Sequence, residues 1–123
     1  MLEVYSVDIE VGADATIPMN NVTIQKGCTA KLSAPATIEL EKCGVYMVSV
    51  DGIAEASTTV SMYKDGVLQP QAQSTSTAIG FTTLVQVSKS NTECCFSSPT
   101  TLQFFNDTAT TFTNFNVCVT KIC

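Results

Sequence analysis

Apolar and polar residues alternate along much of this chain. The clearest case lies between positions 44 and 64, where Tyr46 and Val48 alternate with Val45 and Met47. In an extended chain, successive side chains point to opposite faces, so a period of two in β-branched and aromatic residues predicts strands. No window shows the spacing of apolar residues that is typical of an amphipathic helix.

The alternation predicts a series of short strands separated by turns. The strands are expected at residues 2–11, 15–18, 21–25, 28–32, 36–41, 45–53, 58–64, 67–72, 79–88, 92–97, 100–106 and 111–121. Glycine, proline, asparagine and aspartate lie between them, and Asp65-Gly66 is a strong hairpin signal. Many short strands at this spacing predict an all-β sandwich or barrel.

Composition adds a question about the surface. The 123 residues suit one domain, and 45% are hydrophobic while only 14% are charged. No apolar run approaches the roughly 20 residues that span a bilayer, so we expect no membrane segment. Either the core is large, or part of the surface is apolar and buried in an oligomer; we favour the oligomer.

The charge excludes one class of partner. The formal net charge is −5, and the six basic residues are all lysine. Nucleic-acid binding needs clustered positive charge, with arginine favoured at base edges. We therefore expect no binding to DNA or RNA.

Six cysteines leave the redox state open. They lie at positions 28, 43, 94, 95, 118 and 123. An even number is compatible with disulfides, but we expect mostly reduced thiols that pack as small apolar groups. Cys28 and Cys43 flank a predicted hairpin and are the pair to test first for a disulfide.

The chain lacks the residues of common catalytic sites. There is no histidine, which removes Ser-His-Asp and Cys-His catalysis, and we expect no cofactor. Glu39 and Glu41 could share a strand face, but a solvated strand edge is the favoured interpretation. Asp51, Asp65 and Asp107 lie near predicted turns, where turn hydrogen bonds are favoured over calcium binding. An enzyme is therefore the least favoured class.

Several segments together carry a family resemblance. A strand begins at Gly44-x-Tyr46, the next strand ends in Lys-Asp-Gly at 64–66, a strand follows at 81–87, and a final strand runs over 112–122. In this order they make residues 16–122 resemble the jelly-roll family of the complement C1q and tumour-necrosis-factor (TNF) type. Among its bacterial and phage members, the C-terminal domains of spore-surface collagen-like proteins are the most similar. The resemblance implies a single compact jelly-roll β-sandwich.

The same resemblance implies a tight homotrimer with apolar residues along its threefold axis. Some aromatic residues are candidates for that interface or, alternatively, for the interior of the sandwich: Phe104, Phe105, Phe112, Phe115, Tyr46 and Tyr63. No collagen-like tract precedes the domain in this sequence, so we expect it to lack the stalk of the C1q and spore proteins.

The first strand is expected to act as an arm. We divide the chain into an N-terminal strand, residues 1–14, and a jelly-roll domain, residues 15–123. An extended segment can add to an exposed sheet edge of a partner. The anchoring candidates are Leu2, Val4, Tyr5, Val7 and Ile9.

Two functions remain. The first is a non-enzymatic structural protein that decorates or completes a virus or phage particle, as a capsid decoration or fibre head in the virion. The start of the sequence does not resemble a secretory signal, so we expect cytoplasmic synthesis before assembly. The alternative is a receptor- or carbohydrate-binding head of a phage fibre or of a protein on the bacterial cell or spore surface, with residues 69–77 as its contact loop.

Overall fold

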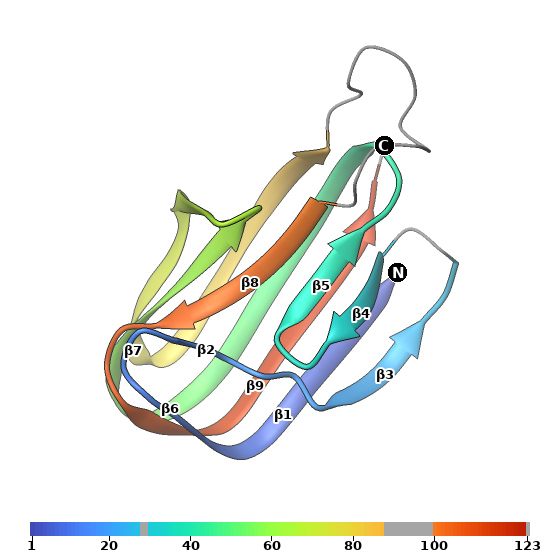
Figure 1. Cartoon of the computed structure of the whole chain (residues 1–123). Helices are drawn as coiled ribbons and strands as arrows, with labels where there is room; N and C mark the ends of the chain where they lie inside the picture. The colour runs from blue at the N-terminus through green and yellow to red at the C-terminus, as the bar shows by residue number, and fades with distance from the viewer. Residues whose placement is uncertain (28–29, 88–99, 123) are drawn as a thin grey trace.

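A computed structural model of the chain describes residues 1–27, 30–87 and 100–122. These residues form nine strands and no helix (Figure 1). The strands are β1 (Leu2–Val11), β2 (Ala15–Thr16), β3 (Asn21–Gln25), β4 (Ala30–Ala34), β5 (Thr37–Leu40), β6 (Gly44–Lys64), β7 (Val67–Val87), β8 (Thr100–Asn106) and β9 (Thr110–Lys121). The all-β prediction is confirmed, and the predicted bounds of β1, β3 and β8 agree with the structure.

Two predicted breaks are wrong. The strands expected at 45–53 and 58–64 form one 21-residue strand, β6, and those expected at 67–72 and 79–88 form one 21-residue strand, β7. Residues 73–76 of β7, in the second predicted break, pair with Thr58–Ser61 of β6, and Thr59 lies opposite Thr75. The hydroxyl oxygens of that pair are 2.6 Å apart. The strand expected at 92–97 lies outside the described residues.

The long strand β6 belongs to two layers. Its first half pairs with β9, through Tyr46–Ala54, and its second half pairs with β8, through Val60–Lys64. The first sheet therefore has the order β3-β1-β9-β6, the second has the order β4-β5-β8-β6, and β7 follows β6 along both. Figure 1 shows β4, β5 and β8 in front of β1, β9 and β6.

A tight turn joins β6 to β7. Asp65 and Gly66 both have positive φ, 51° and 80°, which is the conformation of a two-residue type I′ hairpin. The Asp65 carboxylate also accepts a hydrogen bond of 2.9 Å from the backbone N–H of Thr101. The predicted Asp-Gly turn is confirmed, and its aspartate fastens the hairpin to the start of β8.

The core lies between the two sheets. Phe104 of the second sheet meets Phe115 of the first at a centroid distance of 5.9 Å, and Phe115 also meets Phe112 at 5.6 Å, both edge to face. A Cβ atom at Gly52, opposite Phe115, would lie 2.8 Å from the carbonyl oxygen of Asn114 and 3.2 Å from the Phe115 ring. Glycine therefore allows β6 and β9 to approach closely below this ring cluster.

The first strand is part of the sandwich, which contradicts the division into an arm and a domain at residue 14. β1 pairs with β9 along its whole length, and Leu2–Tyr5 also pair with β3. Leu2 and Val4 are completely buried in the core. Because both sides of residues 2–5 are occupied, these residues offer no free edge to a partner's sheet.

A buried polar network fixes the end of the sandwich at which β6 passes between the sheets. The Asn106 amide donates to the carbonyl oxygens of Val11, Gly12 and Thr108 at 3.3, 3.1 and 2.7 Å. Its own oxygen accepts a hydrogen bond from the buried hydroxyl of Thr58. One asparagine thus connects the ends of β1 and β8 to the bend of β6.

Candidate assembly face

The outer face of the first sheet exposes aliphatic side chains. Met47 of β6 and Leu84 of β7 lie directly opposite each other, 38% and 57% exposed. Further along, Ile53 of β6 and Val7 of β1 lie on either side of Asn114, with 51% and 52% exposed. We call this surface the assembly face. Isolated apolar side chains are common on protein surfaces, but two groups on one sheet face form a candidate contact surface.

The centre of the assembly face is polar and its hydrogen bonds are made within the sheet. The hydroxyls of Ser49 and Thr82 lie 3.1 Å apart, and the Asn116 amide donates to the Asp51 carboxylate at 2.8 Å. Ser49, Asp51 and Asn116 line part of a shallow depression of about 250 Å³ that also includes Tyr5. The hydrogen bonds within the sheet offset part of the desolvation cost of covering Ser49 and Asp51 with another protein.

Four of the six aromatic candidates belong to the core. Phe104, Phe112, Phe115 and Tyr46 are completely buried, so they face the interior and contribute no surface to a trimer axis. Of the two alternatives left open for these four residues, the sandwich interior is the one observed. The Tyr46 hydroxyl donates to the carbonyl oxygen of Lys42 at 2.6 Å, and burial raises the pKa of this tyrosine.

The other two aromatic candidates lie elsewhere. Tyr63 and Phe105 are partly exposed on the outer face of the second sheet, with their ring centroids 4.5 Å apart. Among the aliphatic residues of the assembly face, Val7 was an anchoring candidate, whereas Met47, Ile53 and Leu84 were not identified from the sequence as contact residues. The alternation in the sequence did place Met47 on the face of the strand that Tyr46 does not occupy. This was the signal from which an exposed Met47 could have been predicted.

The anchoring candidates also separate into groups. Leu2 and Val4 are core residues, Ile9 packs against the core, and Tyr5 and Val7 lie toward the assembly face. This division follows the pleat, except near Asp8, where a φ of 50° interrupts the alternation.

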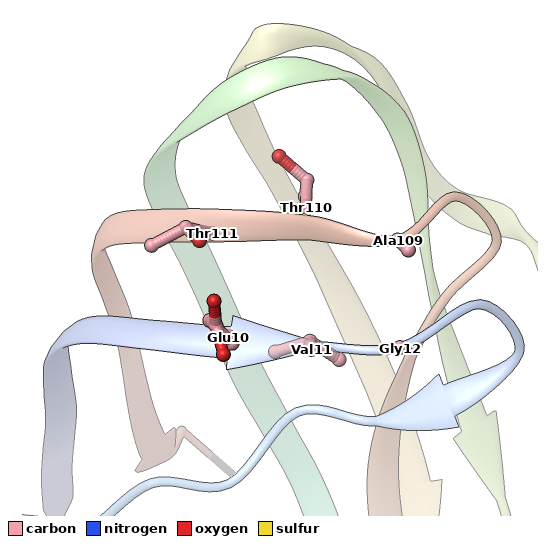
Figure 2. Close-up of a pocket in the computed structure, with 6 residues that line it drawn as sticks. All are labelled: Glu10, Val11, Gly12, Ala109, Thr110 and Thr111. Carbon is pink, nitrogen blue, oxygen red and sulfur yellow. The ribbon is translucent and has the colours of Figure 1, made fainter.

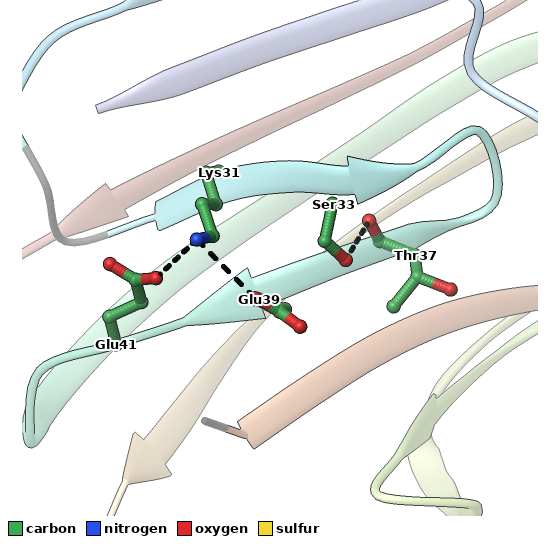
Figure 3. Close-up of polar contacts among 5 residues, drawn as sticks. All are labelled: Lys31, Ser33, Thr37, Glu39 and Glu41. Carbon is green, nitrogen blue, oxygen red and sulfur yellow. Dashed lines mark hydrogen bonds and ion pairs between the residues drawn. The ribbon is translucent and has the colours of Figure 1, made fainter. Parts of the chain in front are cut away.

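The acidic pair of the second sheet is engaged by a lysine. The Lys31 ammonium lies 2.7 Å from Glu41 and 3.8 Å from Glu39, and the side chains are partly exposed (Figure 3). The hydrogen bond to Glu41 is the main reason that the pKa of Lys31 is raised. The carboxylates are solvated, as the favoured interpretation predicted, but Glu39 does not lie on an edge strand, because β5 pairs with β4 on one side and with β8 on the other.

The three candidate calcium ligands do not converge. Asp51 accepts from Asn116, Asp65 from Thr101, and Asp107 from the backbone N–H of Thr59 at 2.9 Å. Within the described ranges, no three metal-ligating side chains lie close enough together to hold an ion. Asp65 and Asp107 accept from the backbone of other strands, and not from the backbone of their own turns as the favoured interpretation predicted.

A further depression lies at the end of the sandwich, between the end of β1 and the start of β9. It has a volume of about 400 Å³ and is lined by Glu10, Val11, Gly12 and residues 109–111 (Figure 2). The Thr110 hydroxyl accepts a hydrogen bond of 3.0 Å from the backbone N–H of Ala56. Glu10 is the one ionisable side chain in this lining, so the lining lacks paired acid and base groups.

The cysteines differ from one another. Cys43 is disulfide-bonded, and Cys118 is a free thiol in the partly buried middle of β9. The expectation of reduced thiols therefore fails for Cys43 and holds for Cys118. Cys28, Cys94, Cys95 and Cys123 lie outside the described residues, so the pair Cys28–Cys43 remains a prediction.

The segment expected as a contact loop is a strand. Residues 69–77 lie within β7, and those from Gln73 onward pair with Thr58–Ser61 of β6. The described part of the chain contains no helix with the length and apolarity needed to cross a membrane.

Solved structures identify the fold. The chain is similar to PRD1 vertex protein P5, with a TM-score of 0.70 and 14% identity over 99% of this chain and 96% of that one. It is also similar to rabbit GITRL, a TNF-like protein, with a TM-score of 0.64 and 7% identity over 100% and 95% of the two chains. The fold is a jelly roll. No family model and no curated protein matches the sequence, so the jelly roll is recognised from its structure.

Proposed function

We propose that this chain is a non-enzymatic structural protein of a virus particle, and that it assembles as a homotrimer. The observation that carries the proposal is the similarity to a phage vertex protein across nearly the full length of both chains. A match of this extent includes the whole jelly roll. The place of action would then be the virion.

The assembly face supports the trimer. Homotrimers are typical of the C1q and TNF jelly-roll family that this sequence resembles, and a trimer needs an apolar surface on each subunit. Met47 and Leu84 on one side and Ile53 and Val7 on the other provide such a surface. Burying these side chains removes apolar area from water, at roughly 25 cal/mol for each Å². A second and a third copy of this chain are the proposed occupants of the face.

Light scattering of the full chain tests the trimer. We expect a mass of three times 13.1 kDa at micromolar concentration. The double variant Met47→Asp/Leu84→Asp should reduce the mass to that of one chain, because association would bury two unpaired carboxylates. Val67→Asp is the matched control, since Val67 is 62% exposed at the hairpin tip, away from the assembly face. A wild-type monomer would refute the trimer.

Cosedimentation tests the particle. The experiment uses virus particles from the source of this gene that lack the protein. These particles should bind the added trimer and carry it to the pellet. The monomeric double variant should bind far less, because single contacts lose the avidity of three linked ones. If the wild-type trimer stays in the supernatant with such particles, the structural role is wrong even if the trimer is correct.

A further inference from the structure

The outer face of the second sheet carries two aromatic rings, Tyr63 and Phe105, among polar groups and beside Leu68, which lies opposite Tyr63 and is also exposed. Phe105 lies between Thr16 of β2 and Ser61 of β6 in the strand register, and Tyr63 lies opposite Gln103. The ring planes of Tyr63 and Phe105 are tilted by 55°. The rings therefore form a ridge among hydroxyl and amide groups.

The rings have no role in the interior. Their neighbours in sequence, Met62 and Phe104, point inward and are completely buried, whereas Tyr63 and Phe105 remain partly exposed. An aromatic ring left partly in water retains apolar area that a ligand can cover, and a tyrosine adds a hydrogen-bonding group.

A groove passes beside the two rings. Its volume is about 340 Å³, and its lining includes Asp14, Thr59 and Ser61 as well as Asp107. This volume is at the lower end of the roughly 300–1,000 Å³ of small-molecule sites. The groove thus combines an apolar wall with several hydrogen-bonding groups, the usual composition of a site for a small polar ligand.

One of the carboxylates in the groove is held in place. The Asp107 Oδ1 atom accepts from the backbone N–H of Thr59 at 2.9 Å and from the hydroxyls of Thr58 and Thr108 at 3.1 and 3.0 Å. These three hydrogen bonds fix the orientation of the carboxylate. A fixed acceptor loses little conformational entropy when it binds.

The charge of the groove selects the ligand. Among the described residues, its lining has two carboxylates, Asp14 and Asp107, and no lysine. An acidic sugar or a phosphate would be repelled by these carboxylates. A neutral sugar presents a C–H face to a ring and hydroxyl donors to carboxylates, and so satisfies both parts of the groove.

We propose that this groove binds a neutral pyranose unit of a glycan. The sugar ring packs on Tyr63 and Phe105, and its hydroxyl groups donate to Asp14 and Asp107. The assembly face lies on the other sheet, so a trimer built through it leaves three such grooves facing outward. The glycan site does not depend on the particle role, and each can fail without the other.

Titration of the full-length protein by NMR tests the site. The probes are the methyl pyranosides of glucose, galactose and mannose, together with N-acetylglucosamine and glucuronic acid as the acidic comparison. We expect at least one neutral sugar to bind with a Kd of about 1–10 mM, which corresponds to a binding free energy of roughly 3–4 kcal/mol. Binding should shift the NMR signals of Tyr63 and Phe105.

Two variants separate ring packing from a general effect on the fold. Phe105→Leu retains apolar volume but removes the ring face, and it should raise Kd about tenfold or more. Tyr5→Leu makes the same kind of change on the first sheet and should leave Kd unchanged. Asp14→Asn should weaken binding less than Phe105→Leu, because the amide oxygen still accepts one hydrogen bond.

Three outcomes would overturn the site. The first is no shift with any neutral sugar at about 50 mM, well above the expected Kd. The second is an unchanged Kd in Phe105→Leu, and the third is tighter binding of glucuronic acid than of every neutral sugar. Folding of each variant is checked by its thermal midpoint, and should Phe105→Leu fail to fold, Tyr63→Leu replaces it with the same expected loss.

Discussion

The two outer faces of the sandwich differ in the side chains that they expose, although both are built on the same long strand. On the first sheet, β6 contributes Met47 and Ile53 beside aliphatic neighbours. On the second sheet, the same strand contributes Ser61 and Tyr63 beside hydroxyl and amide groups. An aliphatic face favours a large dry contact, and a polar face with rings favours a small polar ligand. Under the two proposals made above, assembly and recognition belong to different layers, according to the sheet that each half of β6 joins.

The largest expected effect comes from the core that both faces share. Phe115→Ala removes the ring that joins Phe112 to Phe104 and should lower the free energy of unfolding by about 3–5 kcal/mol. Denaturant unfolding measures this as a lower midpoint with an unchanged slope. Phe105→Ala is the comparison on the outer face, and it should lower the free energy of unfolding clearly less than Phe115→Ala does. An equal decrease in the free energy of unfolding for both variants would mean that the Phe105 ring is part of the core. Phe105 could then not be described as a residue of the outer face.

The next effect concerns the end at which β6 passes from one sheet to the other. Asn106→Ala leaves buried groups of Val11, Thr58 and Thr108 without their partner and should lower the free energy of unfolding by about 2 kcal/mol. Asn114→Ala, a partly exposed asparagine of the assembly face, is the control and should stay within about 0.5 kcal/mol of wild type. If both variants behave alike, the network does not hold the two sheets together.

A smaller effect on stability depends on pH and comes from Asp107, next to the second sheet. The backbone N–H of Thr59 is the main group that holds the pKa of Asp107 below its usual range. A carboxyl whose pKa is lower in the folded state stabilises the fold above its unfolded pKa, and this contribution is lost as the pH falls through the folded pKa. The loss should not exceed about 1 kcal/mol, because solvent screens this exposed group.

Thermal midpoints of wild type and Asp107→Asn at neutral and acidic pH measure this contribution. The two proteins should differ more at pH 7 than at a pH of about 2, where the wild-type carboxyl is also neutral. A difference that stays constant with pH would assign the role of Asp107 to shape and not to charge.

The smallest effect belongs to the rim of the second sheet. Lys31→Met removes the partner of Glu39 and Glu41 from an exposed position. Exposed ion pairs contribute little and are screened by salt. We expect a small decrease in the thermal midpoint at low salt that disappears at high salt, and sugar binding unchanged from wild type. A decrease that persists at high salt would show that the lysine stem stabilises the sheet by packing.

Much of the fold could be predicted from local patterns. Asp65-Gly66 predicted its hairpin because few residues accept positive φ at two successive positions. The continuity of β6 was missed because residues 54–57 resemble a short polar break between two strands. The middle of β7 was missed because Ser and Thr in succession resemble a loop when the partner strand is unknown. In the structure these hydroxyl groups bond across the strands, as in the pair Thr59 and Thr75.

The two candidate surfaces were harder to predict, for a reason that Phe104 and Phe105 make clear. Adjacent residues of a strand must point to opposite faces, so one ring was bound to be inside and the other outside. Nothing local to these two residues decides which is which. Register with Met62 and Ser61 in β6 places Phe104 in the core and Phe105 on the surface.

By itself, the sequence determined the strands and the division of each strand into two sets of side chains, because that division follows from backbone geometry. Only the tertiary structure decided which set faces the core, since burial depends on partners that are far away in the sequence. It also decided that one continuous strand serves both sheets. For that reason Met47 and Ile53 of β6 reach one outer face, and Ser61 and Tyr63 of the same strand reach the other.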